Sequence, residues 1–335
     1  MSEQPDHASA PSPGEAKERL EQALFEIRRV IAGQDAMLER VLVCLLSEGH
    51  LLLEGVPGLA KTLTIKTTAS VLGGSFSRVQ FTPDLVPSDL VGTRVYRPDS
   101  GTFDTELGPV FCNFLLADEI NRAPAKVQSA LLEVMQERQV TIGHDTHPVP
   151  SPFLVMATQN PIESEGTYPL PEAQVDRFML KVLIGYPEHD EELTIVQRQL
   201  VAAPELRQAL TLDELRALQR SVHNVYVDPA LVSYAVTLAT RTRERGGDLG
   251  EYIAFGVSPR GPISLVQAAR ALALVRGRDY TLVDDVTSLA KDALRHRLVL
   301  TYQALAEEVT PDALLDTVLA AVPVPELDLG RARVA

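Results

Sequence analysis

Cysteine is scarce in this chain of 335 residues, and tryptophan is absent. The two cysteines, Cys44 and Cys112, lie within apolar sequence and outside any Cys-x-x-Cys spacing. This placement favours buried, reduced thiols over a disulfide framework or a zinc site. Reduced thiols are typical of a reducing compartment, so we expect a cytoplasmic protein.

Long apolar runs are also missing. No stretch of about 18 uninterrupted apolar residues occurs, which is the length that a membrane-spanning helix needs. Residues 1–14 combine Pro, Ser, Ala and acidic side chains without the apolar segment of a signal peptide, so we expect them to be disordered. The sequence therefore predicts neither a membrane span nor a signal peptide.

Positive charge is in short supply. The chain has 31 Lys and Arg residues against 45 Asp and Glu residues, a formal net charge of −14. A surface that binds nucleic acid must offer net positive charge to the phosphates, and no basic run stands out against this background. The composition therefore disfavours nucleic acid as a partner.

What the chain does contain is a glycine-bearing loop between an apolar run, residues 50–54, and an expected helix, residues 61–72. The loop is close to the phosphate-binding pattern G-x-x-x-x-G-K-[ST], with Ala60 in place of the last glycine. Such a loop wraps backbone N–H groups around a polyphosphate, while Lys61 reaches the outer phosphates and Thr62 binds Mg²⁺. The expected nucleotide contacts are Gly55, Val56, Pro57, Gly58, Leu59, Ala60, Lys61, Thr62 and Leu63.

A second apolar run, residues 111–117, ends in the two carboxylates Asp118 and Glu119. A nearly continuous apolar run is typical of a parallel strand that is buried on both faces. Ligands bind at the carboxyl edge of such sheets, so both carboxylates should face the same crevice as the phosphate loop. A third run, residues 152–157, is followed by Asn160.

The order of the elements predicts an α/β core followed by helices. Five strand candidates alternate with helices, which indicates a parallel sheet: residues 50–54, 75–81, 111–117, 152–157 and 179–184. Two hairpins interrupt this pattern, at residues 93–107 and 139–149, and beyond residue 187 only helical patterns follow. We therefore expect an α/β domain over residues 15–187, a helical domain over 188–323 and an extended tail over 324–335.

Taken together, these motifs resemble the AAA+ ATPases, and specifically the MoxR family. The resemblance rests on Gly55 to Thr62, Asp118-Glu119, Asn160, Arg177 and Ser258-Pro259-Arg260, and it extends over about residues 15–323. It implies a P-loop core with a parallel five-stranded sheet flanked by helices, and a C-terminal all-helical lid. The two hairpins resemble the helix-2 insert and the pre-sensor-1 hairpin of one AAA+ clade.

The resemblance also implies roles for the residues that bind or hydrolyse ATP. Thr62 and Asp118 would hold Mg²⁺, Glu119 would polarise the attacking water, and Asn160 would be the sensor-1 residue. Phosphoryl transfer involves no covalent chemistry by the protein, so these groups act by position and charge. Gly33 and Gln34 resemble the segment that lines the adenine in this family.

Two arginines have both a functional and a structural interpretation. Arg177 resembles the arginine finger that reaches the nucleotide of the next subunit, with Arg122 as a second candidate, and Arg260 resembles the sensor-2 residue. Alternatively, Arg177 pairs with Asp176 or Glu172, and Arg260 is a helix-end charge. The functional interpretation is favoured because the γ-phosphate needs cations beyond Lys61 and Mg²⁺ in the transition state.

The resemblance implies a ring-forming, hexameric ATPase that hydrolyses ATP to ADP and phosphate. MoxR proteins are thought to remodel or mature a protein client, including by metal or cofactor insertion, often with a partner that has a von Willebrand factor A domain. Three alternatives remain open: the ATPase motor of a chelatase complex, a nucleic-acid motor, and a scaffold whose assembly is gated by nucleotide.

Overall fold

The computed structural model describes residues 11–327 apart from 57, 162–165, 203 and 247. Helix α1 (Pro13–Arg28) begins inside the segment that was expected to be disordered. It starts there because Ser12 and Glu15 form a capping box, which satisfies backbone N–H groups at the helix start. The rest of that segment, and most of the expected extended tail, lie outside the described residues.

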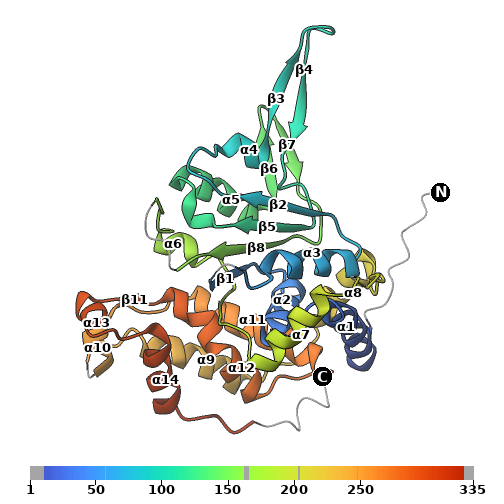
Figure 1. Cartoon of the computed structure of the whole chain (residues 1–335). Coiled ribbons are helices and arrows are strands. Elements are labelled where there is room, and N and C mark those ends of the chain that lie inside the picture. Colours follow the sequence, from blue (N-terminus) through green and yellow to red (C-terminus); the bar gives the residue numbers. More distant parts are fainter. Residues whose placement is uncertain (1–10, 57, 162–165, 203, 247, 328–335) are drawn as a thin grey trace, which may run out of the picture.

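A parallel sheet of five strands forms the centre of the core, as predicted. In spatial order its strands are β2 (Phe76–Gln80), β5 (Phe114–Asp118), β8 (Leu154–Gln159), β1 (Leu51–Gly55) and β9 (Leu180–Ile184) (Figure 1). All four pairings are parallel, so the carboxyl ends of the strands share one edge. The phosphate loop follows β1, and the two carboxylates end β5, so the sheet brings both to that edge.

Helices cover both faces of the sheet. One face packs on α1, α2 (Asp35–Leu46), α3 (Lys61–Val71) and the C-terminal helices, while the other packs on α4 (Pro87–Val91) and α5 (Ala125–Glu137). Alternate side chains of each strand enter the two cores; Leu51 and Leu53 enter the first, and Leu52 enters the second. The two predicted cysteines are free and buried, one in each core.

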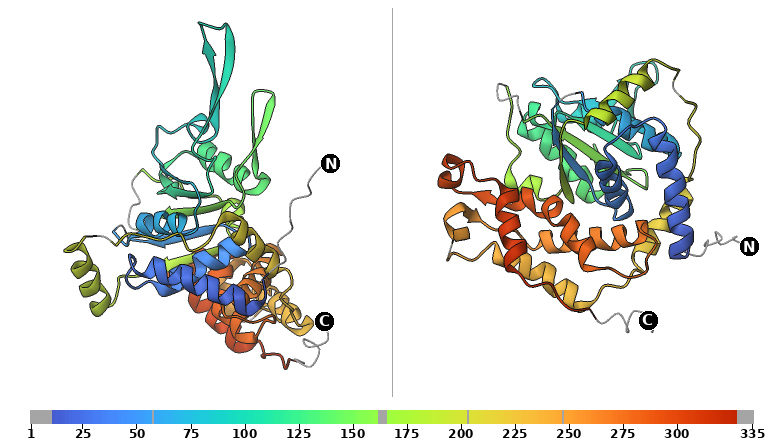
Figure 2. Two further views of the ribbon diagram at one scale, coloured as in Figure 1. Left: turned by 90° about the vertical axis from the view of Figure 1, so that its right-hand side faces the viewer. Right: turned by 60° about the horizontal axis from the view of Figure 1, so that its bottom comes forward.

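Both predicted hairpins are present. The first pairs β3 (Gly92–Arg97) with β4 (Thr102–Leu107), and the second pairs β6 (Gln139–Ile142) with β7 (Asp145–Pro148). Figures 1 and 2 show them projecting from the same side of the core, on the face away from the C-terminal helices. Their tips therefore stand clear of the carboxyl edge where the phosphate loop lies.

The described residues of the C-terminal part are mostly helical, with one short antiparallel pair of strands. That pair, β10 (Ile253–Phe255) and β11 (Val299–Leu300), was not predicted because two or three residues are too short to show alternation. The helices are α8 (Leu212–Val222), α9 (Pro229–Arg241), α10 (Asp248–Tyr252), α11 (Arg260–Val275), α12 (Val283–Leu294), α13 (Tyr302–Ala306) and α14 (Pro311–Ala321). No helix among the described residues is both long and apolar enough to span a membrane.

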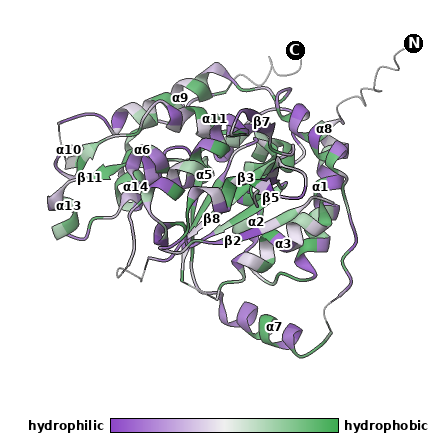
Figure 3. Cartoon of the chain, turned by 90° about the horizontal axis from the view of Figure 1, so that it is seen from above, coloured by the Kyte–Doolittle hydropathy of each residue, from purple (hydrophilic) through white to green (hydrophobic). Residues whose placement is uncertain are grey.

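Two further helices flank β9, the last strand of the core sheet. A short helix, α6 (Glu172–Val175), precedes β9, and α7 (His189–Gln199) follows it. Figure 3 shows α7 standing apart from the rest of the molecule. The core that contains α2 also contains α11 side chains, so the C-terminal helices pack directly on the α/β part.

Candidate functional site

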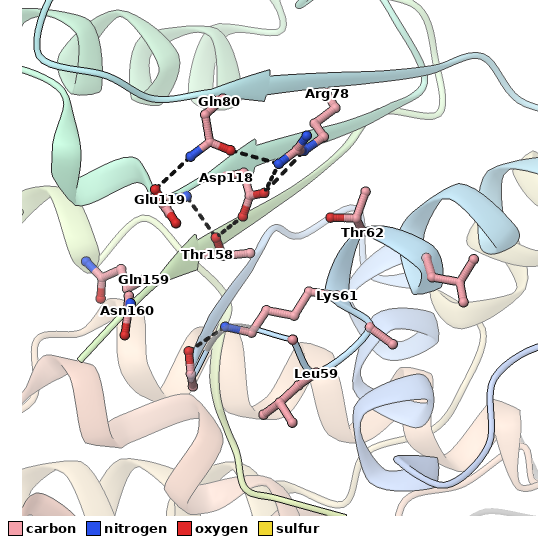
Figure 4. A pocket seen from close by; sticks show the side chains of 14 residues that line it. Leu59, Lys61, Thr62, Arg78, Gln80, Asp118, Glu119, Thr158, Gln159 and Asn160 are labelled. Carbon is pink, nitrogen blue, oxygen red and sulfur yellow. Dashed lines mark hydrogen bonds and ion pairs between the residues drawn. The ribbon is translucent and has the colours of Figure 1, made fainter. Parts of the chain in front are cut away.

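The largest concentration of predicted site residues lines one cavity of about 450 Å³ at the carboxyl edge of the sheet (Figure 4). It gathers the phosphate loop, the end of β5 and the end of β8, which are separated by 40 or more residues in the sequence. Predicted residues on its wall are Gly55, Gly58, Leu59, Ala60, Lys61, Thr62, Leu63, Asp118, Glu119 and Asn160. Val56 lies in the same loop but outside this lining, and Pro57 lies outside the described residues.

The backbone at Ala60 explains why glycine is usual at this position. Ala60 has φ 54° and ψ 19°, which is the left-handed region, and it immediately precedes the first residue of α3. An L-residue with a Cβ atom is strained there by about 1–2 kcal/mol, whereas glycine is not. The loop therefore closes as predicted, although the methyl group leaves local strain.

Lys61 lies at the start of α3 with its amine directed back into the loop. Its Nζ donates a hydrogen bond of 2.6 Å to the carbonyl of Gly55. Partial burial lowers the pKa of Lys61, while the carboxylates of Asp118, Glu119 and Glu54 oppose this shift. The amine is therefore a half-buried cation beside the phosphate loop, as contact with a polyphosphate requires.

Asp118 is held by two donors at the end of β5. Thr158 Oγ1 donates to Asp118 Oδ1 at 2.6 Å, and Arg78 donates to Oδ2 through Nη2 at 2.7 Å and Nε at 3.2 Å. Thr62 also lines the cavity, and Figure 4 shows its side chain bordering the same space. Carboxylate and hydroxyl oxygens are ligands that Mg²⁺ accepts, so this pair fits Mg²⁺ bound with nucleotide phosphates.

Glu119 is fixed in a strained conformation just past the strand. Its φ is 55°, and its backbone N–H donates to Thr158 Oγ1 at 2.8 Å. One oxygen, Oε2, accepts from Gln80 Nε2 at 2.7 Å and from Arg122 Nη1 at 3.2 Å. Left-handed backbone at a non-glycine residue often marks a functional site, where the surrounding structure holds a side chain in place.

A second cavity, of about 250 Å³, contains the two predicted arginines. Arg177 and Arg260 line it together with His50, Asp176, Ile263 and Ser264. Neither arginine lines the cavity of the phosphate loop. Arg177 follows α6 and Arg260 is the first residue of α11, so residues 83 positions apart in the sequence converge (177 and 260).

The structural alternatives for these arginines can now be compared with their contacts. Arg177 Nη1 donates to the carbonyl of Leu132 at 3.1 Å, and its buried Nε has no hydrogen-bond partner among the described residues. Asp176 instead pairs with Arg297 at 2.8 Å and lies 4.0 Å from Arg260. The side chain of Arg260 is 49% exposed, so its guanidinium remains accessible from outside the chain.

Two family models match this chain. The model described as the ATPase family associated with various cellular activities (AAA) matches residues 50–180, and an AAA lid domain matches residues 249–318. Chaperone MoxR1 of Mycobacterium tuberculosis is 59% identical over 313 residues, which cover 92% of this chain and 83% of the relative. The chain belongs to the MoxR family of AAA+ ATPases.

Other similar proteins agree with this assignment. YeaC of Bacillus subtilis is 43% identical over 308 residues, which cover 91% of this chain and 95% of the relative. The crystal structure of a candidate ATPase from Cytophaga hutchinsonii has a TM-score of 0.88 and 43% identity, and the match covers 94% of this chain and 97% of that one. The P-loop core, the helical lid and nucleotide binding are thereby established for this MoxR-family chain.

Four residues in the MoxR-family cavity were not predicted: Arg78, Gln80, Thr158 and Gln159. Arg78 and Gln80 are two residues apart on β2, so both side chains point to the same face of the strand. Polar residues at alternate positions of a strand can be recognised in the sequence, so this spacing could have identified Arg78 and Gln80 as site residues. Their partners are not readable from the sequence, because Arg78 meets Asp118, and Gln80 meets Glu119, only through the pairing of β2 with β5.

Gly33 and Gln34, the predicted adenine segment, do not line the cavity of the phosphate loop. They form two consecutive left-handed residues, with φ values of 68° and 61°, between α1 and α2. A Cβ atom on Gly33 would lie 2.6 Å from the carboxyl carbon of Glu191 in α7. The left-handed backbone favours glycine here, and a Cβ atom would also require the end of the Glu191 side chain to move.

Proposed function

We propose that this chain binds ATP with Mg²⁺, hydrolyses it to ADP and phosphate, and works as a homo-oligomeric ring, with a hexamer as the expected form. The observation that supports a shared site is the division of the predicted catalytic residues between two separate cavities. Lys61, Asp118 and Glu119 line one, whereas Arg177 and Arg260 line the other. A second subunit would bring the two sets together.

Within one subunit, the phosphate-loop cavity would bind the nucleotide. Lys61 would contact the β- and γ-phosphates, and Mg²⁺ held by Thr62 and Asp118 would supply further positive charge there. Glu119 would orient and polarise the attacking water, with Gln80 holding one carboxylate oxygen at 2.7 Å. Asn160, 9% exposed on the same wall, would contact the water or the γ-phosphate.

The arginines would act on the nucleotide of a neighbouring subunit. Charge on the γ-phosphate oxygens in the transition state is stabilised by an arginine delivered from outside the site. Arg177 and Arg260 present two guanidinium groups from one surface cavity. Arg122 is a weaker candidate for this role, because it already contacts Glu119 of its own chain at 3.2 Å.

We further propose that the ATPase cycle drives chaperone-like remodelling or maturation of a protein client, directly or through a von Willebrand factor A partner. The first hairpin offers a suitable contact surface, because Tyr96 and Phe103 form an exposed cross-strand pair with ring centroids 5.2 Å apart. Arg97 of the same hairpin pairs with Asp104 and Glu106. Compensated charge suits a protein surface better than a phosphate backbone.

The decisive experiment mixes two inactive variants. Lys61→Ala should abolish ATP binding but still present Arg177, and Arg177→Ala should bind ATP but present no finger. Mixed rings should recover part of the ATPase activity that neither variant shows alone. Mixtures that co-assemble and stay inactive, while each variant mixes productively with the parent chain, would refute the shared site.

The same assays separate the remaining alternatives. A chelatase motor should be stimulated by a set of chelatase partner subunits and by no isolated protein client. A nucleotide-gated scaffold should assemble with ATP but show turnover that no partner accelerates. Stimulation by a von Willebrand factor A partner or a client would favour the remodelling function.

A further inference from the structure

Helix α7 carries an apolar stripe that faces away from its own chain. Leu193, Val196 and Leu200, the last just beyond the helix end, are 50%, 53% and 80% exposed. At 100° per residue these three positions fall within about 60° of one another around the helix axis. In Figure 3, α7 stands apart from the molecule, and Figure 2 shows the same from the side.

The opposite side of α7 is the one that meets the chain, and polar contacts there accompany the partly buried Ile195. Arg198 Nη1 donates to the carbonyl of Arg28 at 2.8 Å, and the carboxylate of Glu191 lies against Gly33. No residue of α7 is buried. A surface helix normally turns most of its apolar side chains to the core and its polar face to water, so this exposed apolar stripe is unusual for an isolated subunit.

The location of α7 identifies what covers this stripe. Helix α7 follows β9, whose last residue, Ile184, pairs with Gly55 at the start of the phosphate loop, so α7 begins at the edge of the sheet that carries the proposed nucleotide site. A shared active site requires a neighbouring subunit to approach there with Arg177 and Arg260. The cavity that contains those arginines also exposes an apolar side chain, Ile263, which is 56% exposed.

We infer that the stripe of Leu193, Val196 and Leu200 docks on a second copy of this chain, on the surface that carries Arg177 and Arg260. This inference rests on the proposed shared active site and adds the surface that holds it together. In the assembled ring the exposed stripe of α7 would then have an apolar partner. Docking of α7 would also hold the neighbour's arginines beside the nucleotide.

The first test changes the stripe without touching a catalytic group. Leu193→Ser, Val196→Ser and Leu200→Ser together should leave ATP affinity within about twofold of the parent and leave the thermal midpoint unchanged, because all three side chains are exposed. Sedimentation velocity with ATP should show at least a tenfold weaker assembly, and ATPase activity should fall in parallel. The matched control is Val232→Ser with Val236→Ser on α9, which are 41% and 45% exposed.

The second test locates the contact. A photo-crosslinking amino acid at Val196 of the purified chain should capture a second copy when ATP is present. Peptide mapping should place the crosslink near Arg177 or within the first turns of α11, around Ile263. Capture only within the same chain, or on another surface of the second copy, would overturn the inference.

The outcomes separate this inference from the proposed function. A parent chain that assembles and hydrolyses ATP, with a triple variant that does both equally well, overturns the role of α7 and leaves the shared site intact. A parent chain that never assembles overturns both. Weakened assembly in the triple variant, with the α9 control behaving as the parent does, supports the inference.

Discussion

The phosphate-loop cavity and the arginine cavity differ in how fully their charged side chains are paired within one subunit. In the phosphate-loop cavity Arg78, Gln80, Asp118, Thr158 and Glu119 form a closed network of hydrogen bonds in which both carboxylates are held. In the arginine cavity, Asp176 pairs with Arg297 of the lid and lies 4.0 Å from the half-exposed Arg260. Arg177 donates to a backbone carbonyl there rather than to a carboxylate. This contrast supports the proposal that nucleotide is bound within one subunit and that the arginines stabilise charge in the site of the next.

The largest expected effect tests the second cavity. Arg177→Ala should bind ATP nearly as well as the parent but hydrolyse it about a thousandfold more slowly, as expected for an arginine finger. Isothermal calorimetry and steady-state phosphate release measure the two quantities separately. Arg220→Ala, an exposed arginine of α8, is the control and should retain parental turnover. A large loss of ATP affinity in Arg177→Ala would place this residue in the binding cavity of its own subunit.

The next effect tests the first cavity. Glu119→Gln should keep ATP bound and lower turnover by about a hundredfold or more, because an amide cannot polarise water as a carboxylate does. A single-turnover assay with labelled ATP distinguishes slow hydrolysis from slow product release. Glu133→Gln, on the exposed side of α5, should be neutral. Unchanged turnover in Glu119→Gln would assign the role to another carboxylate.

A smaller effect concerns His50, a buried wall residue of the arginine cavity. Its Nε2 lies 3.1 Å from the Met135 carbonyl and its Nδ1 accepts from the Val155 N–H at 3.0 Å, so the ring is neutral. Burial, and secondarily Arg138, lowers the pKa of His50 to about 3. The unfolded chain therefore binds more protons below its ordinary pKa of 6.5.

Stability should accordingly fall as the pH drops from about 6.5 towards 3, by about 1.4 kcal/mol per pH unit for this residue. Urea unfolding at pH 7, 6 and 5 measures the slope, and His50→Gln should reduce it by that amount. An identical slope in His50→Gln would mean that His50 is not held neutral in the folded chain.

The smallest effect returns to the phosphate loop. Ala60→Gly should raise the free energy of unfolding by about 0.5 kcal/mol, because relief of left-handed strain exceeds the added flexibility of the unfolded chain. Ala69→Gly, in the interior of α3, provides a control of opposite sign, with an expected loss of about 1 kcal/mol. Destabilisation by both changes would show that Ala60 is not strained.

The sequence predicted those strands and motifs that are formed by residues next to one another in the chain. Apolar runs identified four of the five sheet strands, and residues 75–81 were expected to be the fifth. The phosphate-loop motif and the two carboxylates identified the phosphate-loop cavity. Arg78 and Gln80 escaped notice because their partners lie 39 or 40 residues away across a strand pairing. The meeting of Arg177 with Arg260 is likewise a product of tertiary packing, which neither motif encodes alone.

The junction at Asp176 has a mechanical consequence. Arg297 of the lid, with a side chain only 1% exposed, donates to Asp176 at 2.8 Å and to the Phe178 carbonyl at 2.8 Å. Breaking a buried ion pair of this kind costs about 3–5 kcal/mol. This cost exceeds the free energy that a few new surface contacts would contribute. Any tilt of the lid would therefore carry the segment that begins β9 with it, including Arg177, which is next in sequence to Asp176.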